Sequence, residues 1–122
     1  MAAMTRFEDI QAWQKARELV HEIYQACAEG HLSRDFGLRA QICRAAVSSM
    51  SNIAEGFARA SDKDFAHFLD IARGSVMEVQ SLLYVALDVG YIGKGEFERL
   101  YKLSGETASL IGGFTSYLRQ RF

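Results

Sequence analysis

The stretch SMSNIAEGFARAS, residues 49–61, decides the fold because it holds the end of one predicted helix and the start of the next. Upstream of it, apolar residues recur at helical spacing and predict a helix over about 38–58. Ser61 and Asp64 then form a variant of the capping box, with Asp in place of Glu. A wide apolar stripe continues the second helix to Gly90, a typical C-cap. The stretch therefore predicts an antiparallel helical hairpin.

Two further helices are predicted on either side of this hairpin. One covers about 7–28 and ends before Gly30, and the last covers about 95–121. No segment alternates with period two, and proline, which helix interiors exclude, is absent. Short turns between helices of this length favour an antiparallel up-down-up-down four-helix bundle. We therefore predict an all-α fold with a single domain, residues 1–122.

The composition limits the class of protein. Of 122 residues 49% are hydrophobic and 24% charged, as in a globular domain, and the net charge of −1 lacks the basic excess of a protein built to hold phosphate backbones. Cys27 and Cys43 have no CxxC partner, which indicates small buried hydrophobes rather than a zinc site or a disulfide framework. No signal segment or membrane-length apolar run is found, so we expect a soluble cytoplasmic protein.

Two apolar stripes run along the predicted helix 38–58. The first is bulky and is expected in the core: Ile42, Ala46, Met50, Ile53 and Phe57. The second shrinks and turns polar: Leu38, Ala45, Ser49, Asn52 and Gly56. Small residues let a neighbouring helix approach, a buried Asn can fix register, and the next helix offers Ala72, Gly74 and Ser75. We interpret this stripe as close packing, with Asn52 level with residues 68–72, in preference to a ligand site.

A third stripe on the same helix is polar throughout: Arg44, Ser48, Ser51, Glu55 and Arg59. Glu55 and Arg59 are four residues apart in the favoured order, which suits a surface pair that stabilises by a few tenths of a kcal/mol. The same short side chains also suit docking against another subunit. Both interpretations stay open at this stage.

The last predicted helix carries more apolar residues than one core stripe needs. Leu103, Leu110 and Tyr117 lie seven residues apart, beside Phe114. Such a face usually marks a partner, and nearby glycines would permit close approach to another helix. We predict that Leu103, Leu110 and Tyr117 contribute to a subunit interface.

No catalytic, cofactor or metal site is predicted. The histidines lack second ligands at metal-binding spacing: Glu18 and His21 form a single Glu-x-x-His, and a di-iron bundle needs two. The serines at 48, 49 and 51 lack a local base. Segment 94–122 has five basic and three acidic residues, and its Lys102, Arg119 and Arg121 are the candidate nucleic-acid contacts. We therefore do not expect an enzyme.

Four ordered motifs carry a family resemblance. They are Phe7-x-Asp9-Ile10-x-x-Trp13-Gln14-x-Ala16, Gly37-Leu38-x-x-Gln41-Ile42-x-Arg44-Ala45-Ala46, Ser51-Asn52-Ile53-Ala54-Glu55-Gly56 and Phe65-x-x-Phe68-Leu69-x-Ile71-Ala72-x-Gly74-Ser75. The chain resembles the bacterial four helix bundle proteins, also called ribosomal-RNA intervening-sequence proteins. The resemblance implies a bundle that often forms homopentamers, without established enzymatic activity. Its motif positions for packing and register are Asn52, Glu55, Gly56, Gly74 and Ser75.

A related group is the accessory variability proteins of diversity-generating retroelements. The resemblance implies for that group a barrel-shaped pentamer with a basic surface that binds nucleic acid and a reverse transcriptase. This chain departs from the group in its charge balance. We therefore expect a non-enzymatic scaffold or interaction protein that binds itself. The alternatives are a nucleic-acid or ribonucleoprotein accessory protein, and a metal or small-ligand protein that uses the bundle core.

Overall fold

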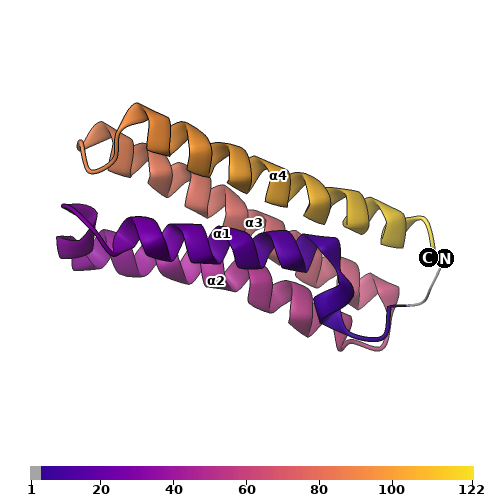
Figure 1. Ribbon diagram of the computed structural model, residues 1–122. Coiled ribbons are helices and arrows are strands. Elements are labelled where there is room, and N and C mark those ends of the chain that lie inside the picture. The colour runs from indigo at the N-terminus through magenta and orange to yellow at the C-terminus, as the bar shows by residue number, and fades with distance from the viewer. Residues whose placement is uncertain (1–3) are drawn as a thin grey trace.

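A computed structural model describes residues 4–122, which form four helices joined by short turns (Figure 1). The helices are α1 (Gln11–Cys27), α2 (Phe36–Phe57), α3 (Asp62–Asp88) and α4 (Lys94–Arg119), and short 3-10 turns at Phe7–Asp9 and Leu32–Arg34 precede α1 and α2. Residues 4–122 contain no strand. The predicted all-α four-helix bundle is confirmed, and residues 1–3 of the predicted domain lie outside the described part.

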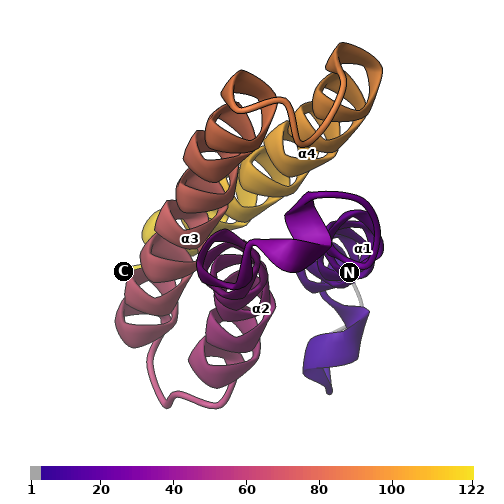
Figure 2. The same cartoon turned by 90° about the vertical axis from the view of Figure 1, so that its left-hand side faces the viewer.

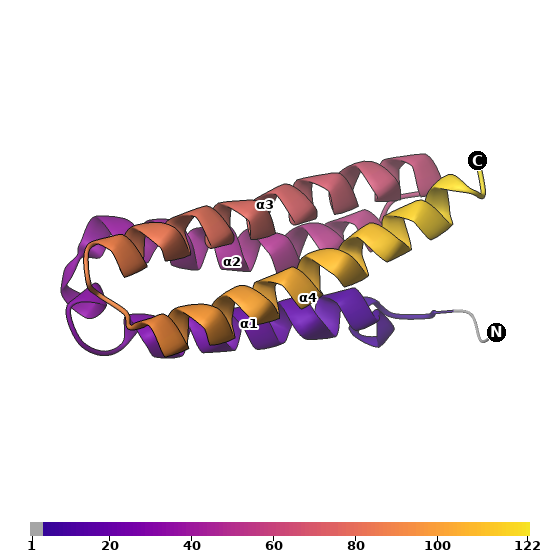
Figure 3. The ribbon, with the colours of Figure 1, turned by 90° about the horizontal axis from the view of Figure 1, so that it is seen from above.

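The bundle consists of two antiparallel hairpins, α1–α2 and α3–α4, packed side by side. α2 contacts α3 and α1 contacts α4, so each helix has two helical neighbours. The N- and C-terminal ends of the described chain lie at the same end of the molecule (Figure 3). Viewed from the other end, α1 and α3 lie on opposite sides of α2 (Figure 2). α2 therefore shares one surface seam with α1 and another with α3.

The predicted helix-end signals around α3 are confirmed. The Ser61 hydroxyl accepts a hydrogen bond of 3.1 Å from the Asp64 backbone N–H, as an N-cap does. After α3, Gly90 adopts a φ of +81°, a left-handed conformation that favours glycine. The Tyr91 N–H then donates to the Ala86 carbonyl at 2.8 Å, which closes the helix end.

The beginnings of α1 and α2 differ from the sequence expectation. α1 begins at Gln11 instead of residue 7, because Ile10 is extended and separates it from the preceding 3-10 turn. α2 begins at Phe36, two residues early, because the Asp35 side chain accepts from the Leu38 N–H at 3.0 Å. Asp35 also accepts from the Tyr91 hydroxyl at 3.1 Å, which raises the pKa of Tyr91. This cap therefore ties the α3–α4 turn to α2.

The core follows the predicted stripes closely in α2 and α3. Ile42, Ala46 and Ile53 of α2 are buried. The apolar stripe of α3 is buried apart from the half-buried Phe68, and consists of Phe65, Phe68, Leu69, Ala72, Val76, Val79, Leu83 and Ala86. The main exception is Tyr24 of α1, which shares the apolar spacing of Val20 and Cys27 on the same helix but is 50% exposed. Its ring lies at the seam with α2, where a groove takes the place of tight packing.

Candidate subunit interface

A chain of hydrogen bonds joins α2 to α3 along their shared seam. Asn52 Nδ2 donates to the carbonyl and to the hydroxyl of Ser48, at 2.9 and 3.0 Å. The Ser48 and Ser75 hydroxyls lie 2.8 Å apart, and Ser75 also donates to the Ile71 carbonyl at 3.1 Å. One proton arrangement satisfies all donors, with Asn52 donating to Ser48, Ser48 to Ser75 and Ser75 to the carbonyl. The polar contact expected for Asn52 thus crosses to α3 through Ser48.

At Gly56 α2 and α3 come close together, because glycine has no side chain to hold them apart. A Cβ atom at this position would lie 2.8 Å from Phe65 Cδ1 and 2.8 Å from Phe68 Cβ. Real Cβ contacts essentially never fall below 3.0 Å. The glycine is therefore required by the packing of the α2–α3 hairpin.

Removing the Ser48 hydroxyl is expected to weaken this seam. Ser48→Ala deletes the contact to Ser75 and one acceptor of Asn52, so the free energy of unfolding should fall by about 1 kcal/mol. Urea denaturation at fixed chain concentration measures the change. Ser51→Ala is the matched control, because Ser51 lies on the same helix but is exposed. Equal stability of the two variants would contradict a structural role for the seam.

The other motif glycine, Gly74, lies on the opposite side of α3, and here the sequence expectation is corrected. It is exposed, and an added Cβ would meet no atom within 4 Å. Gly74 therefore does not serve the approach of α2, although Ala72 is buried and Ser75 lies at the seam. It belongs to the outward-facing row that we call the α3 ridge: Gly74, Met77, Ser81, Val85 and Asp88.

Exposed apolar side chains gather on this helix. Met77 and Val85 of the α3 ridge are 40% and 43% exposed, and Ile71 and Tyr84 beside the ridge are similarly exposed. This surface was not predicted from the sequence, because the ridge alternates apolar residues with glycine, serine and aspartate and does not form an apolar stripe. The heptad spacing of Gly74, Ser81 and Asp88 is the sequence signal that indicates one continuous face of the helix.

The polar stripe of α2 faces outward except at Ser48, which was predicted at a subunit interface but lies in the seam with α3 inside the subunit. Arg44, Ser51 and Glu55 are exposed. The expected pair of Glu55 with Arg59 is absent from residues 4–122, because the Arg59 guanidinium lies over the Phe68 ring at 4.5 Å. Glu55 is left without an ionic partner in the described chain.

The apolar surface predicted on α4 is mostly inside the subunit. Leu103 is only 7% exposed and Leu110 is half-buried against the core. Tyr117 is 39% exposed, but it stacks near Phe114 and lies under the Arg121 guanidinium. Leu103 is therefore a core residue, and the expected exposed stripe does not exist. The reason is that α4 packs against both α3 and α1, which needs a wide apolar face.

The basic residues predicted as nucleic-acid contacts do not form one patch. Arg119 pairs with Asp70, and Arg121 Nε lies 3.1 Å from an Asp62 oxygen, so both arginines pair with carboxylates of α3. Lys102 is exposed but lies about 26 Å from Arg119 along the helix axis. Two of the three positive charges are thus compensated within the subunit.

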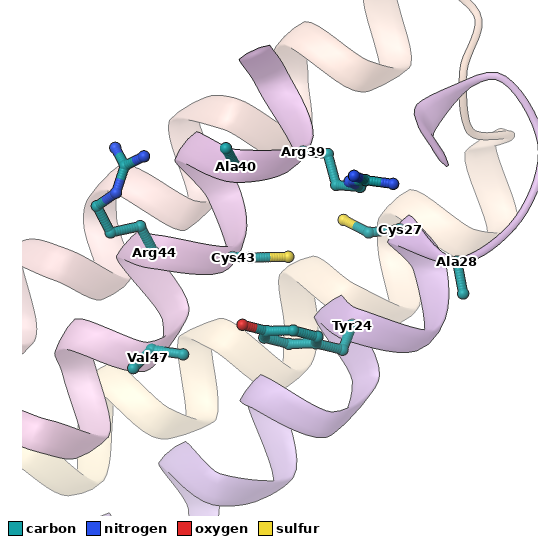
Figure 4. Close-up of a pocket in the computed structure, with 8 residues that line it drawn as sticks. All are labelled: Tyr24, Cys27, Ala28, Arg39, Ala40, Cys43, Arg44 and Val47. Atoms are coloured by element: carbon teal, nitrogen blue, oxygen red, sulfur yellow. The ribbon is translucent and has the colours of Figure 1, made fainter. Parts of the chain in front are cut away.

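A groove of about 650 Å³ follows the seam between α1 and α2 (Figure 4). We call it the α1/α2 groove; its lining residues are Tyr24, Cys27, Ala28, Arg39, Ala40, Cys43, Arg44 and Val47. The sulfur atoms of Cys27 and Cys43 point toward each other, Arg39 lies beside Cys27, and Arg44 extends outward from α2. The groove combines an apolar lining with two cations and contains no acidic residue.

Both cysteines are free and buried, as the sequence predicts. Burial, reinforced by the neighbouring Cys43, raises the pKa of the Cys27 thiol from 9.0 to about 12. Thiolates are the reactive form of cysteine, so Cys27 is an inert hydrophobe at neutral pH.

This pKa predicts a loss of stability in base. Because the folded chain holds the Cys27 proton more tightly than the unfolded chain, the stabilising effect is complete below pH 9 and is lost as the pH approaches 12. The free energy of unfolding should therefore fall over this range, and fall less steeply in Cys27→Ala. Tyr84 and Tyr91, whose pKa values are also raised, affect both proteins alike. Parallel slopes from urea titrations would contradict the assignment to Cys27.

Two further kinds of feature, a metal-ligand cluster and a membrane-spanning helix, were sought in the described residues. Within 4–122, no group of three or more His, Cys, Asp or Glu side chains is arranged to hold a metal ion. None of the helices in this part of the chain is long and apolar enough to cross a membrane.

The molecule is thus a four-helix bundle in which the motif residues Asn52, Gly56 and Ser75 lie at the seam between α2 and α3. The sequence model of the 23S rRNA-intervening sequence protein family matches residues 8–113, and the chain belongs to this family. The resemblance carried by the motifs is confirmed.

A solved structure shows the same fold. It is a protein with unknown function from the S23 ribosomal protein family of Bacteroides thetaiotaomicron, with a TM-score of 0.77 and 24% identity over 85% of this chain and 97% of that chain. At this identity the likeness supports the fold alone. No curated protein matches the chain.

Proposed function

We propose that the protein is a non-enzymatic cytoplasmic scaffold that assembles with copies of itself through its helix faces. The observation that carries the proposal is the α3 ridge. Gly74 costs about 1 kcal/mol relative to alanine in a helix, and no contact within the subunit requires it. Exposed Met77 and Val85 follow it on the same side of α3. Exposed apolar surface beside a glycine is typical of helices that pack against a partner.

The subunit number in this proposal is five, which rests on the family resemblance. Five copies of the 13.7 kDa chain give about 68 kDa. Light scattering coupled to size exclusion, over a dilution series, tests it. A stable species near this mass supports the pentamer, another multiple supports assembly with a different subunit number, and a monomer at all concentrations contradicts the proposal.

A second candidate function is nucleic-acid binding, and one observation favours it. Arg39 and Arg44 form no ion pair within residues 4–122, and the exposed rings of Tyr24 and Phe36 lie in the same region. Cations beside aromatic rings suit single-stranded nucleic acid. This second proposal uses a surface on α1 and α2 instead of the α4 residues predicted from the sequence.

A mobility-shift experiment at low salt tests this candidate. We expect micromolar protein to retard single-stranded RNA, with retardation lost as salt is added, if the candidate is correct. Arg44→Glu should abolish the shift, and Lys102→Glu, which reverses an equal charge on α4, should leave it. Absence of any shift at low salt removes this second function.

A further inference from the structure

We infer that the α1/α2 groove of one copy receives the α3 ridge of a second copy, in a head-to-tail contact. The inference rests on the proposed self-assembly and specifies which two surfaces meet. The two surfaces match in shape, in charge and in height along the bundle.

The shapes of the two surfaces fit one another. The groove is concave and mostly apolar, with Ala40 and Val47 among its lining residues. The α3 ridge is a convex helix surface on which Met77 and Val85 protrude. Between them Ser81 is small and Gly74 has open space around it, so the ridge backbone can come close to a partner.

The charges are complementary. Arg39 lies in the groove beside Cys27, Arg44 extends outward from its α2 edge, and no carboxylate is among the lining residues. The ridge ends at Asp88, which makes no ion pair within residues 4–122. Asp88 is the last residue of α3, where the helix dipole disfavours negative charge. Arg39 is level with Tyr84, one helical turn from Asp88, so Arg39 of a neighbouring copy would relieve this cost.

The two surfaces also lie at the same height along the bundle. Ser48 of α2 is level with Ser75 of α3, and the helices are antiparallel. Counting from this contact, Arg44 is level with Val79 and Ala40 with Leu83. The groove therefore lies at the same height along the bundle as the middle of the α3 ridge.

Equal height matters because a rotation about an axis parallel to the helices moves no residue along that axis. Surfaces at the same height in one copy therefore stay at the same height in its neighbour. Such copies can join a groove to a ridge repeatedly, since the groove lies at the α1–α2 seam and the ridge on the exposed side of α3. A head-to-tail contact of this kind generates a closed ring when the rotation closes. The contact thus explains how one chain could build a cyclic scaffold.

Disulfide cross-linking tests the contact directly. In a Cys27→Ala, Cys43→Ala background, Ala40→Cys introduces a thiol in the groove and Ser81→Cys introduces one on the ridge. The two positions differ by two residues in height, so they should meet across the contact. After oxidation with diamide, the double variant should give a ladder of covalent multimers on a denaturing gel, and its last step counts the subunits.

The matched control combines Ala40→Cys with Ser109→Cys, an exposed serine on α4, and should give no ladder. Native mass of each variant is measured before oxidation. If the protein assembles but only the control yields multimers, or neither does, the groove–ridge contact is wrong while self-assembly stands. A monomeric wild type overturns both. If Arg44→Glu retains the assembled mass and loses retention of single-stranded RNA, the groove is a nucleic-acid site and the inference is overturned.

Discussion

Gly56→Val is expected to lower the melting temperature by roughly 10 °C. Even the first atom of the new side chain would lie 2.8 Å from Phe65 and Phe68. The contact with Phe68 is to its Cβ atom, which cannot move without its backbone, so α2 and α3 must separate. Overpacking of this kind costs about 3 kcal/mol, which corresponds to roughly 10 °C in a domain of this size. Thermal unfolding followed by circular dichroism, at fixed chain concentration, measures the change.

Gly74→Ala is the matched control, since both glycines lie inside helices. The added methyl group meets nothing within 4 Å, so the subunit should gain about 1 kcal/mol from better helix propensity. In the assembled protein the same methyl group would obstruct the partner, so its stability gain should appear only at concentrations where the wild type is dissociated. A loss of stability in the dissociated subunit would mean that Gly74 has an internal role, contrary to the structure.

The second large effect is expected from the α3 ridge. Met77→Glu combined with Val85→Glu adds two charges to surface that the account buries between copies. Charge buried without a partner is costly, so the double variant should be a 13.7 kDa monomer at concentrations where the wild type is assembled. Both side chains are exposed in the subunit, and its fold should therefore survive.

The control for this variant is Ser109→Glu with Ser116→Glu, which adds the same charge to exposed positions of α4. It should retain the wild-type native mass. Dissociation of the control would attribute the effect to net charge, and an assembled Met77→Glu, Val85→Glu variant would show that the α3 ridge is not part of an interface.

The fold could be predicted from the sequence because its signals are local. Ser61 and Asp64 define the start of α3, Gly90 its end, and the apolar spacing defines the faces of the core. The start of α2 was missed because Ser33 and Asp35 both lie in the polar segment before the helix, and either residue type can serve as the N-cap.

The candidate interface could be predicted only in part, for a physical reason. Sequence spacing gives the angle of a residue around its own helix, but not how many neighbours that helix has. Leu103 was predicted at a subunit interface because one core stripe did not need it. It is buried because α4 contacts two helices. Gly74 looked like a packing residue for α2, yet it lies on the outer side of α3. The different roles of Gly56 and Gly74 become visible only from the arrangement of the four helices.

The central claim is that the chain assembles with itself, and native mass measured by light scattering across a dilution series tests it most directly. The account predicts a species of several subunits, near 68 kDa for five copies of the 13.7 kDa chain, that persists at micromolar concentration. A mass of 13.7 kDa at every concentration would contradict the account. The exposed α3 ridge would then require a different protein as its partner.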